Sequence, residues 1–240
     1  MQAFILAGGM GRRLAVVLGG VPKPMAPVAG IPFLDHLVTL VRAGGVRDVV
    51  LLTGHGADAI RRHFGNGRRS GISLAYSREP RPLGTGGALR RALPLVRADR
   101  VLLINGDTWF APDHARLWRM SGPGRCVVAV RPSKKGGRYG GVRIERSGRV
   151  TGWKSRVARG DPGYRHINAG VYCIGRDLIR AMPSGPSSLE ERILPGWVAD
   201  HRVWGVSSRG SFLDIGVPPD YRRAQRLIPA WRRRIEPAHV

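Results

Sequence analysis

The sequence has few cysteines and no long hydrophobic run. Its two cysteines, Cys126 and Cys173, lie in separate apolar segments without C-x-x-C spacing, so we expect buried thiols and no zinc or redox motif. No apolar segment approaches the roughly 18 residues that span a bilayer. The apolar run at the N-terminus is only as long as a strand and follows no charged segment, which argues against an export signal. We therefore expect a cytoplasmic protein.

Acidic residues are also scarce, with 16 Asp and Glu against 40 Lys and Arg, which gives a formal net charge of +24. Only four of the basic residues are lysines, and the arginines are spread along the whole chain. This spread indicates a general composition bias, and the sequence has no basic platform interleaved with aromatic residues. The surface should attract polyanions in a salt-dependent way. We expect no specific nucleic-acid partner.

The C-terminal segment has the highest local density of basic residues. It runs from Arg222 to Arg234 and also contains Leu227, Ile228 and Trp231. This composition is typical of a solvated terminal helix, and it allows a weak contact with an anionic membrane surface. We treat residues 227–240 as a basic tail that follows a single domain of residues 1–226, a length that suits one α/β domain.

The N-terminal segment predicts a strand that leads into a phosphate-binding loop. The apolar run Ala3–Ala7 is followed by glycines at positions 8, 9 and 11, arginines at positions 12 and 13, and Lys23 between two prolines. Glycine allows positive φ and close backbone approach, so main-chain N–H groups can face an anion. Arginine then offers a fork of donors and lysine a point charge to the same polyphosphate.

Two familiar glycine motifs do not fit this segment. A P-loop requires Lys and then Ser or Thr after its last glycine, whereas Gly11 is followed by Arg12 and Arg13. The dinucleotide fingerprint requires a third glycine where the chain has Leu14. Neither a P-loop ATPase nor an NAD enzyme is favoured.

Strands and helices alternate through the first half of the chain. Strands are predicted at 48–53, 72–77 and 101–104, and helices at 33–43, at about 57–64 and from Gly86 toward Pro94. Alternation of this kind predicts an α/β fold with a doubly wound, mainly parallel, Rossmann-like sheet. Ligands bind such sheets beyond the carboxyl ends of the strands.

Asp107 follows one of these strand ends. The apolar run Val101–Ile104 is typical of a central strand, and Asn105-Gly106-Asp107-Thr108 comes directly after it. A carboxylate there could hold a hard cation that bridges phosphate oxygens, while the simpler alternative is an Asx turn that closes the strand. The glycine loop favours the metal.

The second half of the chain is less regular. We predict a strand at 125–131, a hairpin from 142–145 to 149–153, and a strand at 167–174 in which Asn168 precedes two small residues. A helix is predicted at 187–194, a strand at 211–216, and a helix from Pro218 or Pro219 through Arg226.

Six segments in order resemble the sugar-1-phosphate nucleotidylyltransferase family. They are LAGGMGRRL (6–14), PKPM (22–25), LGTGGAL (83–89), NGDT (105–108), INAGVY (167–172) with SLEE (188–191), and FLDIGVPPDY (212–221). LGTGGAL together with FLDIGVPPDY is most similar to the short bacterial branch that contains the D-glycero-D-manno-heptose 1-phosphate guanylyltransferases. The resemblance implies a nucleotide-diphospho-sugar transferase fold without a β-helix domain. It also implies a nucleotide-binding part at about 1–110 and a sugar-binding part at about 111–210.

The resemblance implies a reaction in which a sugar 1-phosphate attacks the α-phosphorus of a nucleoside triphosphate in line and releases pyrophosphate. We expect GTP and D-glycero-D-manno-heptose 1-phosphate as substrates and Mg²⁺ as cofactor. The attacking phosphate is already a nucleophile, so catalysis should consist of positioning and charge neutralisation. As catalytic residues the resemblance implies Arg13, at the β- and γ-phosphates, and Lys23, at the α-phosphate.

The resemblance also implies the binding residues. For the nucleotide they are Leu6, Ala7, Gly8, Gly9, Gly11, Arg12, Gly86 and Gly87. For the sugar phosphate they are Asn105, Gly140, Lys154, Arg156, Asn168 and Glu190. For the metal they are Asp107 and Asp214.

The chain departs from the family pattern at two places. Arg12 stands where the family usually has Thr, and Trp153-Lys154-Ser155-Arg156 stands where many members have Phe-x-Glu-Lys. Either Lys154 or Arg156 could supply the missing charge, although an arginine fork is not equivalent to an ammonium. Mannose 1-phosphate and N-acetylmuramate 1-phosphate remain alternative substrates. A non-catalytic homologue that binds NDP-sugars is the alternative from another class, and a homodimer is left open.

Overall fold

The structure is a computed structural model of the chain, and it describes residues 1–9, 11, 14, 18–133, 139–158, 161 and 163–235. Two compact units make up the chain. Unit 1 comprises Met1–Pro82, Ile104–Ala111 and Ser211–Val240, and unit 2 comprises Leu83–Leu103 and Pro112–Gly210. The proposed division into nucleotide-binding and sugar-binding parts stays a prediction.

Parallel strands form the centre of unit 1. β1 (Gln2–Ala7) pairs in parallel with β4 (Asp48–Thr53), which pairs in parallel with β5 (Ser73–Arg78). Ala7 lies opposite Thr53, so β1 and β4 end at the same edge. Most residues of β1 and β4 are buried, as expected for strands that are covered on both faces. The glycine-rich loop therefore begins at the carboxyl edge of this sheet.

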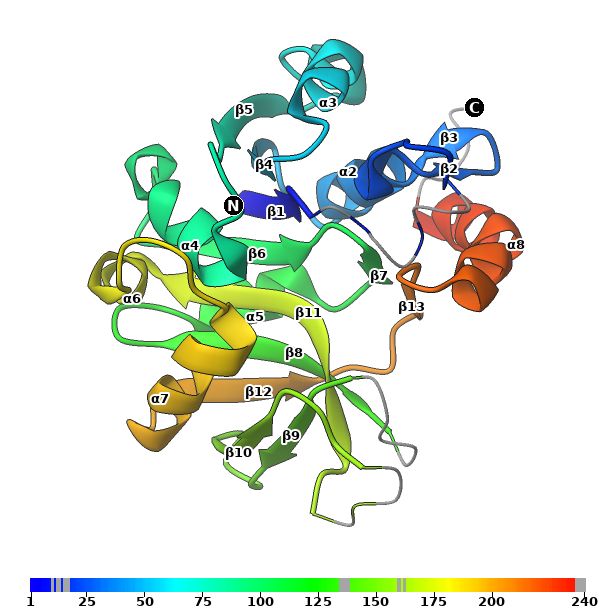
Figure 1. Cartoon of the computed structure of the whole chain (residues 1–240). Helices are drawn as coiled ribbons and strands as arrows, with labels where there is room; N and C mark the ends of the chain where they lie inside the picture. The colour runs from blue at the N-terminus through cyan, green and yellow to red at the C-terminus, as the bar shows by residue number, and fades with distance from the viewer. Residues whose placement is uncertain are drawn as a thin grey trace. The chain divides into compact units, whose positions relative to one another are not determined.

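The described residues of unit 1 also form three α-helices and two small sheets. The helices are α2 (Phe33–Ala43), α3 (Ala57–Phe64) and α8 (Pro218–Ile235), with 3₁₀ turns at Lys23–Met25 and Arg68–Ser70. The small sheets pair β2 (Pro27–Val28) with β3 (Ile31–Pro32), and β7 (Thr108–Phe110) with β13 (Phe212–Asp214). Figure 1 shows α8 beside α2 and the β2–β3 hairpin.

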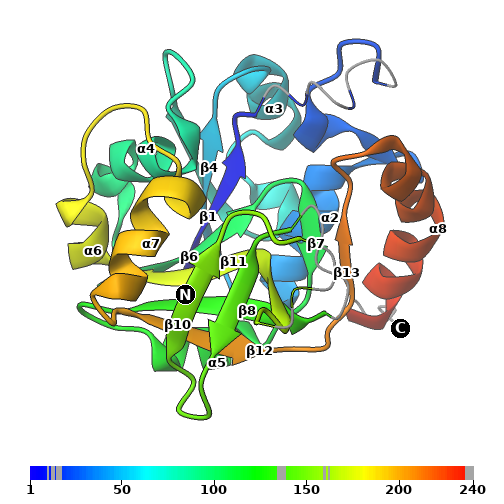
Figure 2. The same cartoon turned by 60° about the horizontal axis from the view of Figure 1, so that its bottom comes forward.

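The strands of unit 2 pair both in parallel and antiparallel. They are β6 (Arg100–Asn105), whose last two residues belong to unit 1, β8 (Cys126–Pro132), β9 (Gly141–Ile144), β10 (Val150–Lys154), β11 (His166–Gly175) and β12 (Val203–Ser207). β11 pairs antiparallel with both β8 and β9, and β12 pairs in parallel with β8. The predicted hairpin is formed by β9 and β10, and α7 (Leu194–Ala199) packs against β10 (Figure 2).

The other helices of unit 2 are short. They are α4 (Gly84–Arg91), a 3₁₀ turn at Leu93–Leu95, α5 (His114–Met120), α6 (Arg176–Ala181) and a π-helix at Leu189–Ile193. The predicted α/β class is confirmed, and the antiparallel pairs of unit 2 make the arrangement mixed. No helix in the described part of the chain is both long enough and apolar enough to cross a membrane.

Both cysteines are buried free thiols, as expected. Burial raises the pKa of the Cys173 thiol to about 12, and it raises the pKa of Cys126 as well. Two predicted helices differ from the structure. The segment predicted as a helix at 187–194 is a π-helix that continues into α7, although Ser188 caps it as expected. Helix α8 continues past Arg226 to Ile235, since Ile228 is buried and adds another turn to its apolar face.

Candidate active site

The three glycines of the loop after β1 have different surroundings. A Cβ on Gly8 would lie 2.7 Å from Glu79 Oε1 and 3.1 Å from the Gly54 backbone nitrogen, so a side chain there would crowd the backbone at the end of β4. A Cβ on Gly9 would meet no described residue within 4 Å. Gly11 has φ of 59°, and its Cβ would lie 2.8 Å from Lys23 Cβ. Gly11 therefore permits close contact between the loop and the lysine.

For four other residues predicted to bind the nucleotide, the structure shows no contact that tests the prediction. Arg12 and Arg13 lie outside the described residues, so their assignments stay predictions. Leu6 and Ala7 are the last residues of β1, and Ala7 is buried. Their placement at the strand end agrees with the predicted nucleotide-binding edge.

Lys23 is the first residue of a 3₁₀ turn, Lys23–Met25, and the prolines on either side of it, Pro22 and Pro24, restrict the backbone. Its side chain is only 11% exposed, and its Nζ lies 2.5 Å from Asp107 Oδ2. The ion pair joins residues that are 84 positions apart in the sequence. The structure therefore brings together Lys23 and Asp107, which the sequence placed in different motifs.

Asp107 is held by its neighbours in the turn after β6. Thr108 Oγ1 donates a hydrogen bond to Asp107 Oδ1 at 3.0 Å, and the Ile215 N–H donates to the Asp107 carbonyl at 2.9 Å. A Cβ on Gly106 would overlap the carbonyl oxygen of Leu6, so only glycine fits against the end of β1. This close approach places the Asp107 turn beside the glycine loop.

Asp214 lies next to the same turn, because β13 pairs with β7 and places Asp214 opposite Thr108. The Asp214 carboxylate accepts a hydrogen bond from the Gly216 N–H at 2.5 Å. Two carboxylates on adjacent segments suit Mg²⁺, which commonly takes one or two protein carboxylates and completes its shell with phosphates and water. No cluster of three or more metal-binding side chains occurs among the described residues. The donor set thus fits a metal that arrives with a phosphate ligand.

Asn105 immediately precedes this turn. Its Oδ1 atom is buried and has no hydrogen-bond partner among the described residues. A buried acceptor without a partner costs free energy, and it often marks a place where a ligand or water binds. The predicted role of Asn105 in binding the sugar phosphate is consistent with this position.

In unit 2, the predicted nucleotide-binding glycines have a packing role. The N–H groups of Gly86 and Gly87 both donate to the Ser187 carbonyl, at 2.9 and 3.1 Å. A Cβ on Gly86 would lie 2.5 Å from Ile193 Cδ1 and 3.1 Å from the same oxygen, so glycine allows α4 to lie close to the segment before the π-helix. These N–H groups are therefore already bonded, and a contact with the nucleotide stays a prediction.

Glu190 and Asn168 belong to one hydrogen-bond network in unit 2. Tyr172 Oη accepts from Asn168 Nδ2 at 2.7 Å and donates to Glu190 Oε1 at 3.3 Å. Thr85 Oγ1 donates to Glu190 Oε2 at 2.6 Å, and Trp153 Nε1 donates to the Glu190 carbonyl at 2.8 Å. The two residues predicted to bind the sugar are thus held in fixed orientations.

Tyr172 and Thr85 were not predicted as site residues. Burial, followed by the charge of Glu190, raises the pKa of Tyr172 well above its usual value, so the phenol remains protonated and can donate. Both residues lie inside sequence motifs that were recognised, LGTGGAL and INAGVY. Each is a residue with a polar side chain in a motif that is otherwise glycine-rich or apolar, and this feature could have identified both as site residues.

Lys154 and Arg156 are in different environments. Lys154 Nζ lies 3.3 Å from Asp161 Oδ2 and 4.8 Å from the centre of the Tyr164 ring. A hydrogen bond from the Gly163 N–H and the nearby Lys154 hold the pKa of Asp161 below its usual value. Arg156 is exposed and has no ion pair with any residue that the structure describes.

Gly140 occupies a crowded position near these residues. Its carbonyl accepts a hydrogen bond from the Asn168 N–H at 2.8 Å, and a Cβ would lie 2.9 Å from the Lys154 carbonyl. Gly140 therefore connects the predicted sugar residue Asn168 to the end of β10.

Comparison with known proteins decides the family. A model described as nucleotidyl transferase matches residues 2–230. The chain belongs to the nucleotidyl transferase family. This confirms the family that the six motifs resemble, and the chain is a sugar-1-phosphate nucleotidylyltransferase.

Relatives of this nucleotidyl transferase act on different sugars. The chain is 38% identical to a D-glycero-alpha-D-manno-heptose 1-phosphate guanylyltransferase of Aneurinibacillus thermoaerophilus, over 95% of this chain and 98% of that enzyme. It is 32% identical to a mannose-1-phosphate guanylyltransferase of Mycobacterium tuberculosis, over 93% of this chain and 63% of that enzyme. Both relatives are named as guanylyltransferases.

Solved structures have the same fold. HddC from Yersinia pseudotuberculosis superposes with a TM-score of 0.83 at 29% identity, covering 94% of this chain and 98% of that one. HddC has also been solved in complex with GMP-PN, with a TM-score of 0.82 at 30% identity over the same shares of the two chains. This nucleotidyl transferase therefore has the same α/β fold as HddC, a protein whose structure has been solved with the guanine nucleotide GMP-PN.

Proposed function

We propose that this enzyme transfers a guanylyl group from GTP to D-glycero-D-manno-heptose 1-phosphate, forming GDP-heptose and pyrophosphate for glycan biosynthesis. The observation that carries the proposal is 38% identity to a heptose 1-phosphate guanylyltransferase along almost the full length of both chains. The guanine nucleotide in the HddC complex supports the choice of base.

The proposed reaction needs no nucleophile from the protein. A phosphate oxygen of the sugar phosphate forms a bond to the α-phosphorus of GTP, and the bond from that phosphorus to the oxygen bridging to the β-phosphorus breaks. The electron pair leaves with pyrophosphate. The described cysteines agree with this scheme, because both are buried and their raised pKa values keep them protonated.

Lys23 is proposed to stabilise the negative charge that develops at the α-phosphate. Its small exposure and its ion pair with Asp107 fix the ammonium before substrate binds. A preorganised charge of this kind contributes to catalysis without reorganisation during the reaction. Arg13 is proposed to bind the β- and γ-phosphates.

Asp107 and Asp214 are proposed to hold Mg²⁺. When bound, Mg²⁺ would neutralise phosphate charge and orient the triphosphate. The hydrogen bonds that Asp107 receives from Thr108, and Asp214 from Gly216, orient both carboxylates without a metal. Glu190 and Asn168 are proposed to bind sugar hydroxyls through the atoms that their network leaves available.

The test is pyrophosphate release in the presence of Mg²⁺. Purified enzyme is assayed with GTP, ATP, CTP or UTP against the 1-phosphates of heptose, mannose, glucose and N-acetylmuramate. We expect the highest kcat/KM for GTP with heptose 1-phosphate. A preference for GTP with mannose 1-phosphate would overturn the assignment of heptose as the sugar and would leave the assignment of guanine as the base unchanged. No turnover by folded protein with any pair would favour the non-catalytic alternative.

A further inference from the structure

Glu190 is the acidic residue of the predicted sugar site, and two neutral donors hold its carboxylate. Thr85 Oγ1 donates to Oε2 at 2.6 Å, and Tyr172 Oη donates to Oε1 at 3.3 Å. Glu190 is only partly exposed, and it has no ion pair with any residue that the structure describes. These contacts orient the carboxylate, and among the described residues no cation balances its negative charge.

The hydrogen bond from Tyr172 to Glu190 has a fixed direction. The Gly170 N–H can only donate, and it donates to Asn168 Oδ1 at 3.1 Å. The Asn168 amide therefore turns its Nδ2 toward Tyr172 Oη, at 2.7 Å, and the phenol oxygen accepts this bond. The proton of the phenol is then available for Glu190, which accepts it.

The hydrogen bond from Thr85 is directed in the same way. The Leu189 N–H, which can only donate, lies 2.8 Å from Thr85 Oγ1. The threonine oxygen accepts this bond, so its own proton points to Glu190 Oε2. Both hydrogen bonds that the structure describes at the carboxylate therefore run toward Glu190, which acts only as an acceptor.

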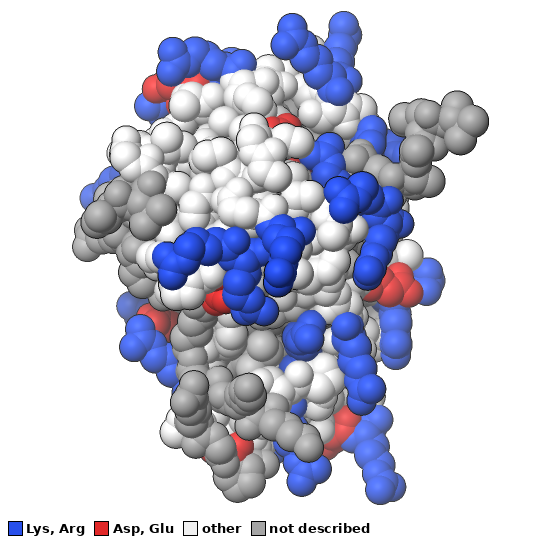
Figure 3. All heavy atoms as spheres, turned by 90° about the vertical axis from the view of Figure 1, so that its right-hand side faces the viewer, with Lys and Arg blue, Asp and Glu red and all other residues white. Residues whose placement is uncertain are grey.

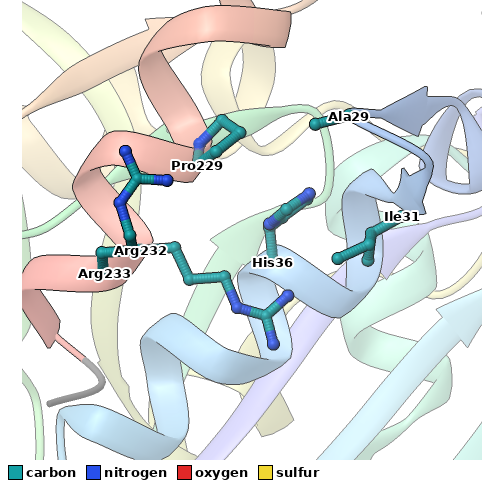
Figure 4. A pocket seen from close by; sticks show the side chains of 6 residues that line it. All are labelled: Ala29, Ile31, His36, Pro229, Arg232 and Arg233. Carbon is teal, nitrogen blue, oxygen red and sulfur yellow. The ribbon is translucent and has the colours of Figure 1, made fainter. Parts of the chain in front are cut away.

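The general charge of the molecule does not select against acidic ligands. The formal net charge is +24, and Lys and Arg side chains are spread widely over the face shown in Figure 3. Such a surface attracts an acidic sugar phosphate at least as strongly as a neutral one. The cavity of unit 1 beside α8 has no acidic residue among the described residues that line it, and its side chains of Arg232 and Arg233 point apart (Figure 4). Rejection of an acidic sugar therefore requires a local negative charge.

We propose that Glu190 is a specificity-determining residue that rejects sugar 1-phosphates carrying a carboxylate. The inference rests on the proposed function, in which Glu190 binds hydroxyl groups of the sugar. A hydroxyl can donate to the Glu190 carboxylate, whereas a second carboxylate has no proton to donate and repels the first. N-acetylmuramate 1-phosphate, one of the alternative substrates, carries such a carboxylate and is disfavoured for this reason.

The test compares two nucleotide sugars that differ at a single carbon. GDP-mannuronate has a carboxylate at C6, where GDP-mannose has a hydroxymethyl group. Their dissociation constants are measured by isothermal titration calorimetry for wild type, Glu190→Gln, Glu190→Ala and Glu191→Gln. Glu191 is the matched control, because it is the next residue of the same π-helix and is exposed. A general loss of affinity in a variant cancels in the ratio of the two constants.

We expect wild type to bind GDP-mannose at least about ten-fold more tightly than GDP-mannuronate. Glu190→Gln and Glu190→Ala should lower this preference to about two-fold or less, because the negative charge is lost. Glu191→Gln should keep the wild-type preference. The effect of the charge is thus separated from that of an adjacent carboxylate outside the network.

Salt dependence provides a measurement on wild type that needs no substitution. Salt weakens the repulsion by Glu190, so the preference for GDP-mannose should fall as the salt concentration rises. Attraction by the general basic surface has the opposite effect, because salt then weakens the binding of the more acidic compound. A purely structural role of Glu190 would not produce a falling preference.

The outcomes distinguish this proposal from the proposed function. Equal affinity of wild type for the two compounds, or a preference that both Glu190 variants retain, would overturn the role of Glu190. Loss of the preference in these variants, together with no pyrophosphate release from any substrate pair, would support the role of Glu190 and overturn the catalytic function alone. Wild type that binds neither compound would overturn both.

Discussion

The predicted sites in the two units use opposite kinds of polar group. In unit 1, charged residues form the centre of the predicted site: Lys23 pairs with Asp107, and Asp214 lies on the adjoining strand. In unit 2, a buried and neutral phenol links Asn168 to Glu190, and Thr85 and Trp153 complete the network. The charged cluster of unit 1 is suited to binding phosphate, and the hydrogen-bond network around Tyr172 in unit 2 is suited to recognising hydroxyls.

This difference has a physical reason. Phosphates carry several charges, so a site for them requires cations and a metal held by carboxylates. Sugar hydroxyls are neutral, and a protein distinguishes them by hydrogen-bond donors and acceptors that are held in fixed orientations. The comparison predicts that substitutions in the charged cluster of unit 1 reduce the rate, whereas substitutions in the Tyr172 network of unit 2 change the KM of the sugar phosphate.

The largest expected effect follows from Asp107→Asn. The amide cannot balance Lys23 or hold a hard cation as well as a carboxylate, so kcat should fall by about 10²-fold or more. Binding of Mn²⁺, measured by electron paramagnetic resonance, should weaken in parallel. Asp58→Asn is the control, because Asp58 is an exposed carboxylate of unit 1 that pairs with Arg78. Full Mg²⁺-dependent turnover by Asp107→Asn would show that the metal assignment is wrong.

A buried, neutral histidine in unit 2, His114, can be tested by acidification. Burial lowers the pKa of His114 to about 4, so between about pH 6.5 and 4 the unfolded chain binds more protons than the folded one. The free energy of unfolding should therefore fall by about 3 kcal/mol as the pH falls through this window, and this contribution should change little below pH 4. Urea unfolding of wild type and His114→Phe measures it.

The His114→Phe variant should lose most of this pH dependence. His55→Gln, which replaces an exposed histidine, should keep the wild-type dependence. If wild type and His114→Phe show the same slope between pH 6.5 and 4, another group is responsible for the acid sensitivity.

Replacing Tyr172 with Phe should produce a smaller and more selective effect. The phenol hydroxyl that orients Asn168 and Glu190 is lost, which should raise the KM for the sugar 1-phosphate by about ten-fold. The KM for the nucleotide should change less than about two-fold. Tyr76→Phe is the control, because its hydroxyl donates to the Gly65 carbonyl in unit 1. An equal rise in both KM values for Tyr172→Phe would contradict the assignment of this network to the sugar.

The smallest expected effect distinguishes Arg156 from Lys154. Arg156→Ala should raise the KM for the sugar phosphate by about two- to five-fold, because an exposed charge without an ion pair can bind phosphate directly. Lys154→Ala should raise it less, since Asp161 already balances part of the lysine charge. Steady-state kinetics with varied sugar phosphate will show which residue matters more, and a larger effect of Lys154→Ala would reverse the assignment.

The sequence predicted the elements whose pattern is local. Helix α2 has the bounds expected from its apolar spacing and the two glycines that follow it, and β4 has the bounds expected from its apolar run. The placement of Asp107 at a strand end followed from the rule for parallel sheets. These features depend on a few neighbouring residues, which a single sequence contains.

Features that depend on distant residues could not be predicted in this way. The π-helix at Leu189–Ile193 has a visible serine cap, but its main contacts are with Thr85 and Trp153, which are far away in the sequence. Gly86 and Gly87 are predicted to approach the nucleotide, but the sequence does not show that a Cβ on Gly86 would meet the Ile193 side chain and the Ser187 carbonyl, or that one on Gly87 would meet the Gly185 carbonyl. A sequence shows that a glycine needs space around it without showing what occupies that space.

The most direct test of the proposed mechanism is the stereochemical course at the α-phosphorus. The enzyme would be given a GTP analogue with a chiral α-thiophosphate and a sugar 1-phosphate, and the configuration of the nucleotide sugar would be determined by ³¹P NMR. Direct attack by the sugar phosphate, positioned by charges and without a protein nucleophile, predicts inversion. Retention would require two displacements through a nucleotide bound covalently to the enzyme, and it would contradict this mechanism.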